Sequence, residues 1–132
     1  MKIIAVGRMK SPYKQLALDF QKRIKKRLNI VEVLETNKFR ETREIIKRLR
    51  DSKGKKILFD VKGKMVSPDF FEKLPWNAVL IIGGPDGVDK ELYNHVDEVV
   101  SISPLIFNHQ LFRIILLEQI YRAQTNSKYK SH

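Results

Sequence analysis

The stretch Ala78-Val79-Leu80-Ile81-Ile82-Gly83-Gly84-Pro85-Asp86-Gly87 joins five apolar residues directly to a glycine-rich bend. A short, wholly apolar run that ends at glycine and proline is typical of a strand buried on both faces, as in the parallel sheet of an α/β domain. In open α/β sheets, ligands bind beyond the carboxyl ends of the strands, where a glycine backbone can approach them closely. The stretch therefore predicts a central strand over residues 78–82 and a ligand site at the bend.

Strands and helices alternate along the rest of the chain. Apolar runs predict further strands over residues 2–6, 30–34, 56–61 and 98–102. The second of these alternates apolar and charged residues, so it is expected near an edge. Helical spacing predicts helices over residues 11–28, 41–50, 67–74 and 108–124 and a short one from Asp89, with a turn at 62–64. The alternation predicts an α/β fold with a mainly parallel sheet flanked by helices, in one domain spanning residues 1–132.

Charge is distributed unevenly along the 132 residues. Residues 1–56 hold 18 of the 26 lysines and arginines but only 6 of the 15 acids, so the net charge of +11 belongs to the first half. Such asymmetry indicates that the first half meets a polyanion, with Lys14 to Arg50 as the basic region. A lysine-rich surface that serves solubility alone is the other interpretation of the same composition.

Composition also narrows the class of protein. The chain has no cysteine, which excludes disulfides and thiolate metal sites, and its early apolar run, Ile3 to Val6, is too short for a signal peptide or a membrane span. We therefore expect a soluble, cytoplasmic protein. His95, His109 and His132 lack the spacing and the accompanying acids of a metal site, so structural or hydrogen-bonding roles are expected for them and no metal is predicted.

The last predicted helix is apolar on nearly every side. Only a narrow polar strip interrupts its apolar residues, which are Leu111, Phe112, Ile114, Ile115, Leu116, Leu117, Ile120 and Tyr121. A helix of this kind is buried on more than one face. A partner subunit could supply the second cover, which predicts a homodimer. The alternative is a central helix packed between the sheet and neighbouring helices of the same chain.

The glycine bend alone does not specify a chemistry. A dinucleotide site would need a glycine-rich turn after the first strand, where Gly7 stands alone, and no Gly-Lys-Ser/Thr follows Gly87 as a phosphate-binding loop would require. The sequence shows no serine nucleophile elbow or paired carboxylates. Taken by itself, Asp86-Gly87 is typical of a plain turn.

Several segments together resemble a known family. The bend Ile81-Ile82-Gly83-Gly84-Pro85-Asp86-Gly87 is followed by Ser101-Ile102-Ser103-Pro104-Leu105-Ile106-Phe107-Asn108-His109-Gln110-Leu111 and by Arg113-Ile114-Ile115-Leu116-Leu117-Glu118-Gln119-Ile120-Tyr121-Arg122-Ala123. With Ala5-Val6-Gly7-Arg8 and Phe59-Asp60-Val61-Lys62-Gly63-Lys64, these segments resemble the pseudouridine N3-methyltransferases of large-subunit (23S) ribosomal RNA, in the SPOUT superfamily. The resemblance spans nearly the whole chain.

This resemblance implies a fold, a cofactor and partners. It implies an α/β domain whose carboxyl-terminal part forms a trefoil knot, a homodimer, S-adenosylmethionine as cofactor, and ribosomal RNA or the ribosome as substrate. Motif matching implies that the cofactor contacts Phe59, Gly83, Ile102, Ser103, Pro104, Leu105, Ile106 and Phe107. A side chain at Gly83 is expected to intrude on the bound ligand.

Catalytic roles follow from the resemblance less directly. The family has a Tyr-His-basic ending near the site, whereas this chain ends Lys128-Tyr129-Lys130-Ser131-His132. Tyr129 matches, Lys130 stands in the histidine position, and His132 falls two places later. His132 is a candidate proton acceptor, and Lys130 and Arg113 are candidates for stabilising the acceptor anion. A buried ion pair with Glu118 or another acid is the structural alternative for Arg113, and a frayed chain end is the alternative for the others.

Two other functions fit the sequence. One is a noncatalytic RNA-binding module associated with the ribosome, which would keep the fold without binding S-adenosylmethionine. The other is a SPOUT methyltransferase that acts on transfer RNA.

Overall fold

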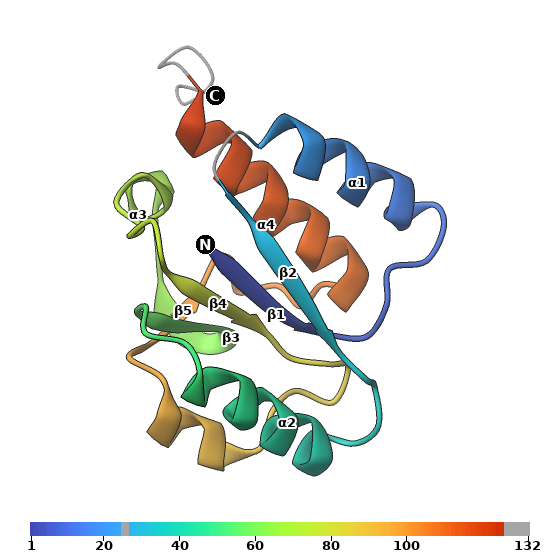
Figure 1. Cartoon of the computed structure of the whole chain (residues 1–132), viewed down its shortest axis with the longest axis vertical. Coiled ribbons are helices and arrows are strands. Elements are labelled where there is room, and N and C mark those ends of the chain that lie inside the picture. Colours follow the sequence, from blue (N-terminus) through green and yellow to red (C-terminus); the bar gives the residue numbers. More distant parts are fainter. Residues whose placement is uncertain (25–26, 126–132) are drawn as a thin grey trace.

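Five parallel strands form one sheet at the centre of the molecule. The computed structural model describes residues 1–24 and 27–125 (Figure 1). The sheet order is β2-β1-β4-β3-β5, and every pair is parallel. The strands are β1 (Lys2–Val6), β2 (Asn29–Val33), β3 (Lys56–Met65), β4 (Val79–Ile82) and β5 (Glu98–Ser101). The predicted α/β fold with a mainly parallel sheet is confirmed, and within the described residues the sheet is wholly parallel.

The position of each strand in the sheet follows its hydrophobic pattern. All four residues of β4 are buried, because β1 and β3 flank it and helices cover both faces. Its register pairs Ile81 with Ile4 of β1 and with Leu58 of β3. β2 pairs only with β1 and leaves Asn29 and Glu32 exposed, so the prediction that it lies near an edge is confirmed.

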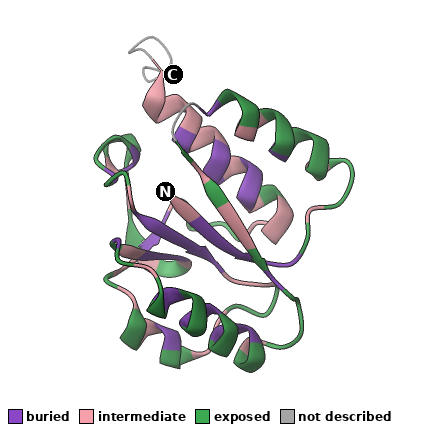
Figure 2. Cartoon of the chain, in the orientation of Figure 1, coloured by how far each residue is buried: buried purple, intermediate pink, exposed green. Residues whose placement is uncertain are grey.

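Helices cover the two faces of the sheet unequally. α1 (Tyr13–Arg23), α3 (Pro68–Glu72) and α4 (His109–Gln124) lie on one face, and α2 (Lys38–Arg50) and the 3₁₀ helix η1 (Lys90–His95) lie on the other (Figure 1). Each face has its own apolar cluster, one around Leu80 and Leu116 and the other around Ile4 and Ile45. Buried residues therefore concentrate in the strands and on the helix sides that face them (Figure 2).

The predicted turn at residues 62–64 is wrong. β3 continues through it to Met65, with an irregular register between Phe59 and Lys64 where the strand pairs with β5. Gly63 makes this possible, because a Cβ atom there would lie 2.6 Å from the backbone of Val100. The turn signal of Lys62-Gly63-Lys64 thus marks a close approach between two strands and not a chain reversal.

Several helix ends differ from their predicted positions. α1 ends at Arg23, so the apolar stripe expected to reach residue 28 breaks where Ile24 becomes extended. Ser11 does not cap this helix: the N-cap position is Pro12, and Ser11 Oγ accepts a hydrogen bond from the Gln15 side chain. α2 begins three residues earlier than predicted, since the Asn37 side chain accepts from the amides of Phe39 and Arg40. α3 and η1 are also shorter or tighter than regular α-helices.

α4 is enclosed largely by its own chain. Its buried residues pack on the sheet, and α1 and α3 lie beside it. The sequence allowed two ways to bury this helix: a partner subunit, or the sheet and helices of the same chain. The structure shows the second of these. Among the described residues, no helix is long and apolar enough to cross a membrane.

Candidate functional site

A cavity of about 600 Å³ opens at the carboxyl ends of the central strands. Its walls come from β3, the bend after β4, the loop after β5 and the start of α4. The lining residues are Phe59, Asp60, Val61, Ile82, Gly83, Gly84, Pro85, Gly87, Val88, Val100, Ser101, Ile102, Ser103, Leu105, Ile106, Phe107, Asn108, His109 and Phe112. The sequence predicted a ligand site at this end of the sheet, and the structure supports it with a hollow of ligand size.

The glycine bend forms one wall of the cavity. β4 ends at Ile82, and the chain then reverses over Gly84 and Gly87, whose amide donates to the Gly84 carbonyl at 3.0 Å. Gly87 has a φ of +77°, which favours glycine. A Cβ at Gly83 would lie 2.8 Å from Cγ1 of Val88. A side chain at position 83 would therefore displace Val88, so the packing of the bend also favours glycine there.

The loop between β5 and α4 forms the opposite wall. The hydroxyl of buried Ser101 donates to the Ser103 carbonyl at 2.8 Å, and the Leu105 amide donates to Ser103 Oγ at 3.0 Å. These bonds hold the loop in a tight curve. The curve leaves Leu105 and Ile106 exposed, with 86% of Ile106 accessible. The loop thus presents apolar side chains at the mouth of the cavity.

Phe59 is a buried aromatic residue of the cavity lining. It is 94% buried, stacks on Phe71 with a 12° angle between the rings, and lies 5.9 Å from the Phe112 ring centroid. Seven of the eight residues predicted for the cofactor line this one cavity, namely Phe59, Gly83, Ile102, Ser103, Leu105, Ile106 and Phe107. Pro104 is in the same loop but does not line it.

Asp60 is a lining residue that the sequence analysis did not assign to the site. Its Oδ2 accepts from the Tyr93 hydroxyl at 2.6 Å and its Oδ1 accepts from the Lys62 amide at 3.0 Å. The hydrogen bond to Asp60, together with burial and the negative charge, raises the pKa of Tyr93 to about 12. Its position in the sequence could have indicated this role, because Asp60 directly follows Phe59, the last residue of β3 that pairs with β4.

His109 is a second residue that sequence reasoning left outside the site. It opens α4, lines the cavity, and places Nε2 3.6 Å from Oε1 of Glu35. The adjacent Asn108 caps the helix, its Oδ1 accepting from the Gln110 amide at 2.8 Å. His109 adjoins Gly7, since a Cβ there would lie 3.6 Å from Nε2. The histidine thus adds a polar side chain to the cavity lining.

The four residues proposed for catalysis are not assembled by the described part of the chain. Arg113 is 3% exposed and does not line the cavity. Its Nη1 donates to Glu32 Oε2 at 2.5 Å and its Nη2 to the Gly7 carbonyl at 2.8 Å. The ion pair is therefore with Glu32 and not with Glu118, which pairs with Arg122. Tyr129, Lys130 and His132 lie outside the described residues.

The cavity fits S-adenosylmethionine in size and in chemistry. Aromatic and aliphatic side chains enclose most of it, as a purine ring requires, while Ser101, Ser103 and the glycine backbone supply polar groups on the two walls. The described residues contain no group of three or more potential metal ligands. The apolar side chains and glycine backbone of the lining suit an organic cofactor.

Comparison with known proteins identifies the family of this chain. Residues 1–130 match the sequence profile of the family described as "Predicted SPOUT methyltransferase". The chain is 37% identical over 142 residues to the ribosomal RNA large subunit methyltransferase H of Mycoplasmopsis synoviae, with 96% of each chain covered. It is 37% identical over 146 residues to the protein of the same name from Clostridium novyi, covering 92% of this chain and 91% of the relative. The protein from Fusobacterium nucleatum is 36% identical over 149 residues, with 96% of each covered. The chain belongs to the SPOUT methyltransferase family, whose enzymes use S-adenosylmethionine.

Proposed function

We propose that this enzyme transfers the methyl group of S-adenosylmethionine to N3 of a pseudouridine in large-subunit (23S) ribosomal RNA, in the cytoplasm. The observation that carries this proposal is the cavity, where seven residues from β3, the glycine bend and the loop after β5 converge. The relatives named as methyltransferases of large-subunit ribosomal RNA, aligned over nearly their whole lengths, support the substrate class.

The chemistry required of the protein is positioning and proton removal. The cofactor supplies a methyl group that its sulfonium already makes electrophilic. The walls formed by Gly83 and by residues 102–107 hold the cofactor, and the open mouth beside Ile106 admits an unstacked base. The N3 proton must leave before or during transfer, so a base or a cation near the acceptor accelerates the step. We assign these roles to Tyr129, Lys130 and His132.

A homodimer with a carboxyl-terminal trefoil knot belongs to the same proposal. Leu105 and Ile106, at the mouth of the cavity, and Leu111, on the first turns of α4, are large exposed apolar residues. A partner subunit that covers them would also enclose the cavity. Light scattering at micromolar concentration should give twice the mass of the chain, whereas a monomer would contradict the dimer.

The reaction is tested by transfer of tritiated methyl groups to three acceptors: ribosomes, isolated ribosomal RNA and transfer RNA. We expect tritium label in large-subunit ribosomal RNA. We expect no label in ribosomal RNA whose target pseudouridine is already methylated at N3. Label found only in transfer RNA would refute the substrate. Calorimetry with S-adenosylmethionine alone tests the cofactor site, and absence of binding would favour the noncatalytic module.

The same assay tests the tail. A variant that ends at Lys128 should bind S-adenosylmethionine almost as well as the full chain, because the cavity walls lie within residues 59–112. Its methyl transfer should fall by at least roughly 100-fold if the tail provides acid-base catalysis. Unchanged turnover would contradict the assignment of Tyr129, Lys130 and His132.

A further inference from the structure

A second hollow, separate from the cofactor cavity, runs between the edge strand β2 and the helix α2. We call it the α2 groove. Its lining residues are Glu32, Val33, Leu34, Thr36, Arg40, Arg43, Glu44, Lys47 and Arg48. Four cations and two acids thus face the same open space, and the role of the groove depends on which of these charges are already paired.

Both acids of the α2 groove are neutralised by other residues. Glu32 accepts from the buried guanidinium of Arg113, and Glu44 pairs with Lys47 at 3.1 Å. No ion pair within 4 Å holds Arg40, Arg43 or Arg48 among residues 1–24 and 27–125. Three exposed guanidinium groups therefore remain free. Guanidinium binds phosphate oxygens through two parallel hydrogen bonds, so the groove suits a chain of phosphates.

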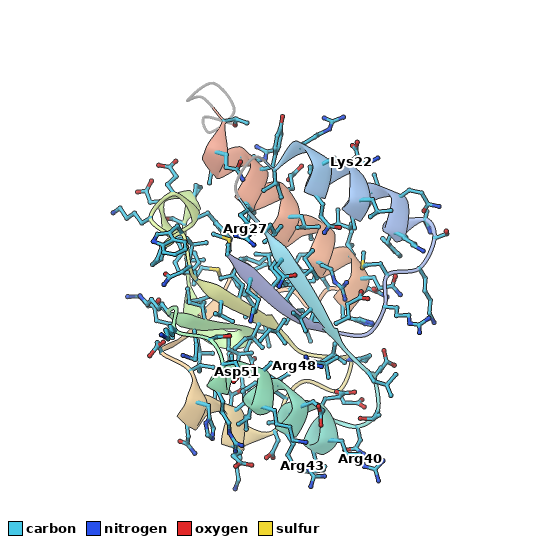
Figure 3. The ribbon with its side chains drawn as sticks, viewed as in Figure 1. Lys22, Arg27, Arg40, Arg43, Arg48 and Asp51 are labelled. Atoms are coloured by element: carbon cyan, nitrogen blue, oxygen red, sulfur yellow. The ribbon has the colours of Figure 1, made fainter. Side chains whose placement is uncertain are left out.

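The helix α2, which supplies most of the groove lining, packs next to the glycine bend of the cofactor cavity. The first turns of α2 contact the bend that forms the cavity wall, because the Asp89 amide donates to Thr42 Oγ1 at 3.0 Å. Gly84 also adjoins the buried Glu41, whose Oε1 would lie 2.9 Å from a Cβ at that position. Arg40 and Arg43 extend from α2 at one end of the molecule, whereas Lys22 lies on α1 near the other end (Figure 3). The cations of α2 are therefore carried by a helix that contacts the bend of the cavity wall.

An exposed aromatic ring completes this surface. Phe39 is 57% exposed on the first turn of α2, and Lys38 Nζ lies 5.4 Å from its ring centroid. Arg43 follows four residues later, so it lies one turn along the same side of the helix. An exposed aromatic ring among cations is the arrangement on which unpaired bases stack while their phosphates are held electrostatically.

We propose that the α2 groove and Phe39 form the docking surface for a single-stranded segment of the RNA substrate. Arg40, Arg43 and Arg48 bind its phosphates, Phe39 stacks on one unpaired base, and the strand continues past the glycine bend to the cavity mouth. This inference rests on the proposed function, since it assigns to the methyltransferase the surface that grips its RNA. Phosphate contacts fix the position of the strand and do not read its sequence.

The test compares two charge-matched triple variants of the full chain. Arg40→Gln/Arg43→Gln/Arg48→Gln empties the α2 groove of free cations, and Lys14→Gln/Lys22→Gln/Arg27→Gln removes three exposed cations elsewhere. Binding to an unmodified large-subunit ribosomal RNA transcript is measured by filter retention across a range of salt concentrations. We expect the first variant to bind at least roughly tenfold more weakly and to lower the salt slope by about 2, the value for three lost single-strand phosphate contacts. Equal losses in the two variants, or a larger loss in the second, would overturn the proposal.

A second pair of variants tests stacking. Phe39→Ala should weaken binding about fivefold or more, and Phe39→Trp should restore it. Trp76→Ala is the control, because Trp76 is 79% exposed but precedes β4, at the amino ends of the strands. A loss with Trp76→Ala as large as that with Phe39→Ala would contradict the assignment.

Kinetics separate this inference from the proposed function. In methyl transfer to ribosomes, the α2 variant should raise KM at least tenfold with little change in kcat, because the cavity is untouched. If the unaltered enzyme labels ribosomes and the α2 variant keeps the KM of its control, the docking surface is wrong and the function stands. If the unaltered enzyme labels no ribosomal RNA, the function fails, and the binding comparison still decides the surface.

Discussion

The two basic helices, α1 and α2, differ in how they are attached and in what they adjoin. α1 buries Ala17 alone among its residues, and its exposed apolar side chains include Leu16 and Leu18. α2 buries five residues, among them Ile45, and meets the glycine bend at its first turns. Both helices carry many cations, yet only α2 combines free guanidinium groups with a position beside the cavity. Two helices of similar composition therefore differ in role because they pack on different faces of the sheet and contact different elements.

Truncating one apolar residue on each helix tests whether α2 is packed more tightly than α1. This comparison has the largest expected effect on the free energy of unfolding. Ile45→Ala should lower the free energy of unfolding by about 3 kcal/mol, because Ile45 is fully buried. Leu18→Ala should cost less than about 0.5 kcal/mol, because Leu18 is 48% exposed. Urea unfolding of both variants measures the two costs. Comparable costs would mean that α1 is covered as firmly as α2.

The ion pair between Glu32 of β2 and Arg113 of α4 has a smaller expected effect. Glu32→Gln should lower the free energy of unfolding by about 2 kcal/mol, since it leaves the buried guanidinium of Arg113 without its carboxylate. Glu32 is itself partly exposed, which keeps the expected cost below that of a fully buried pair.

Glu44→Gln is the matched control for this change. It removes the same charge from the same groove, but its pair with Lys47 is exposed and should contribute less than about 0.5 kcal/mol. Equal costs from Glu32→Gln and Glu44→Gln would show that the Arg113 pair contributes no special stability. Neither variant should weaken RNA binding, since each makes the groove more positive.

The hydrogen bond from Tyr93 of η1 to Asp60 ties the α2 side of the sheet to the cavity wall and has the smallest expected effect. Tyr93→Phe should cost about 1 kcal/mol at neutral pH. The folded protein holds the tyrosine proton with a pKa of about 12, whereas the unfolded chain loses it near the ordinary value of 10.0. This contribution is therefore intact below pH 10 and is lost as the pH rises toward 12.

Urea unfolding of the enzyme and of Tyr93→Phe at pH 8, 10 and 11 measures this dependence. The difference in stability between the two proteins should stay constant from pH 8 to about 10 and shrink at 11. A difference that grows with pH would contradict the role of Asp60 as the acceptor.

Residues 78–82 illustrate how far local pattern predicts this fold. Their unbroken apolar run correctly indicated a strand buried on both faces, and the alternation in residues 30–34 correctly indicated an edge. Gly63 illustrates the limit. Its neighbours read as a turn, but the glycine serves a close approach to Val100, which is distant in the sequence. A local pattern cannot distinguish these two uses of glycine.

The site shows the same limit. Seven of the eight residues that motif resemblance selected for the cofactor line one cavity, and they stand in three short segments with recognisable sequence. The resemblance did not select Asp60 or His109, whose importance depends on Tyr93 and Glu35 lying beside them. Arg113 was recognised as either a catalytic residue or half of an ion pair, and only the folded chain identified Glu32 as its partner.

The sequence by itself determined the order of most elements, the parallel α/β class and the family, and it predicted a ligand site at the bend over residues 83–87. Each of these depends on residues close together in the chain or on motifs that can be matched directly. The tertiary structure decided the strand order β2-β1-β4-β3-β5 and the placement of α1 and α2 on opposite faces. It also decided that Glu32 pairs with Arg113, so that this acid does not pair with Arg40, Arg43 or Arg48 in the α2 groove. These features depend on contacts between distant segments, which hydrophobic periodicity does not encode.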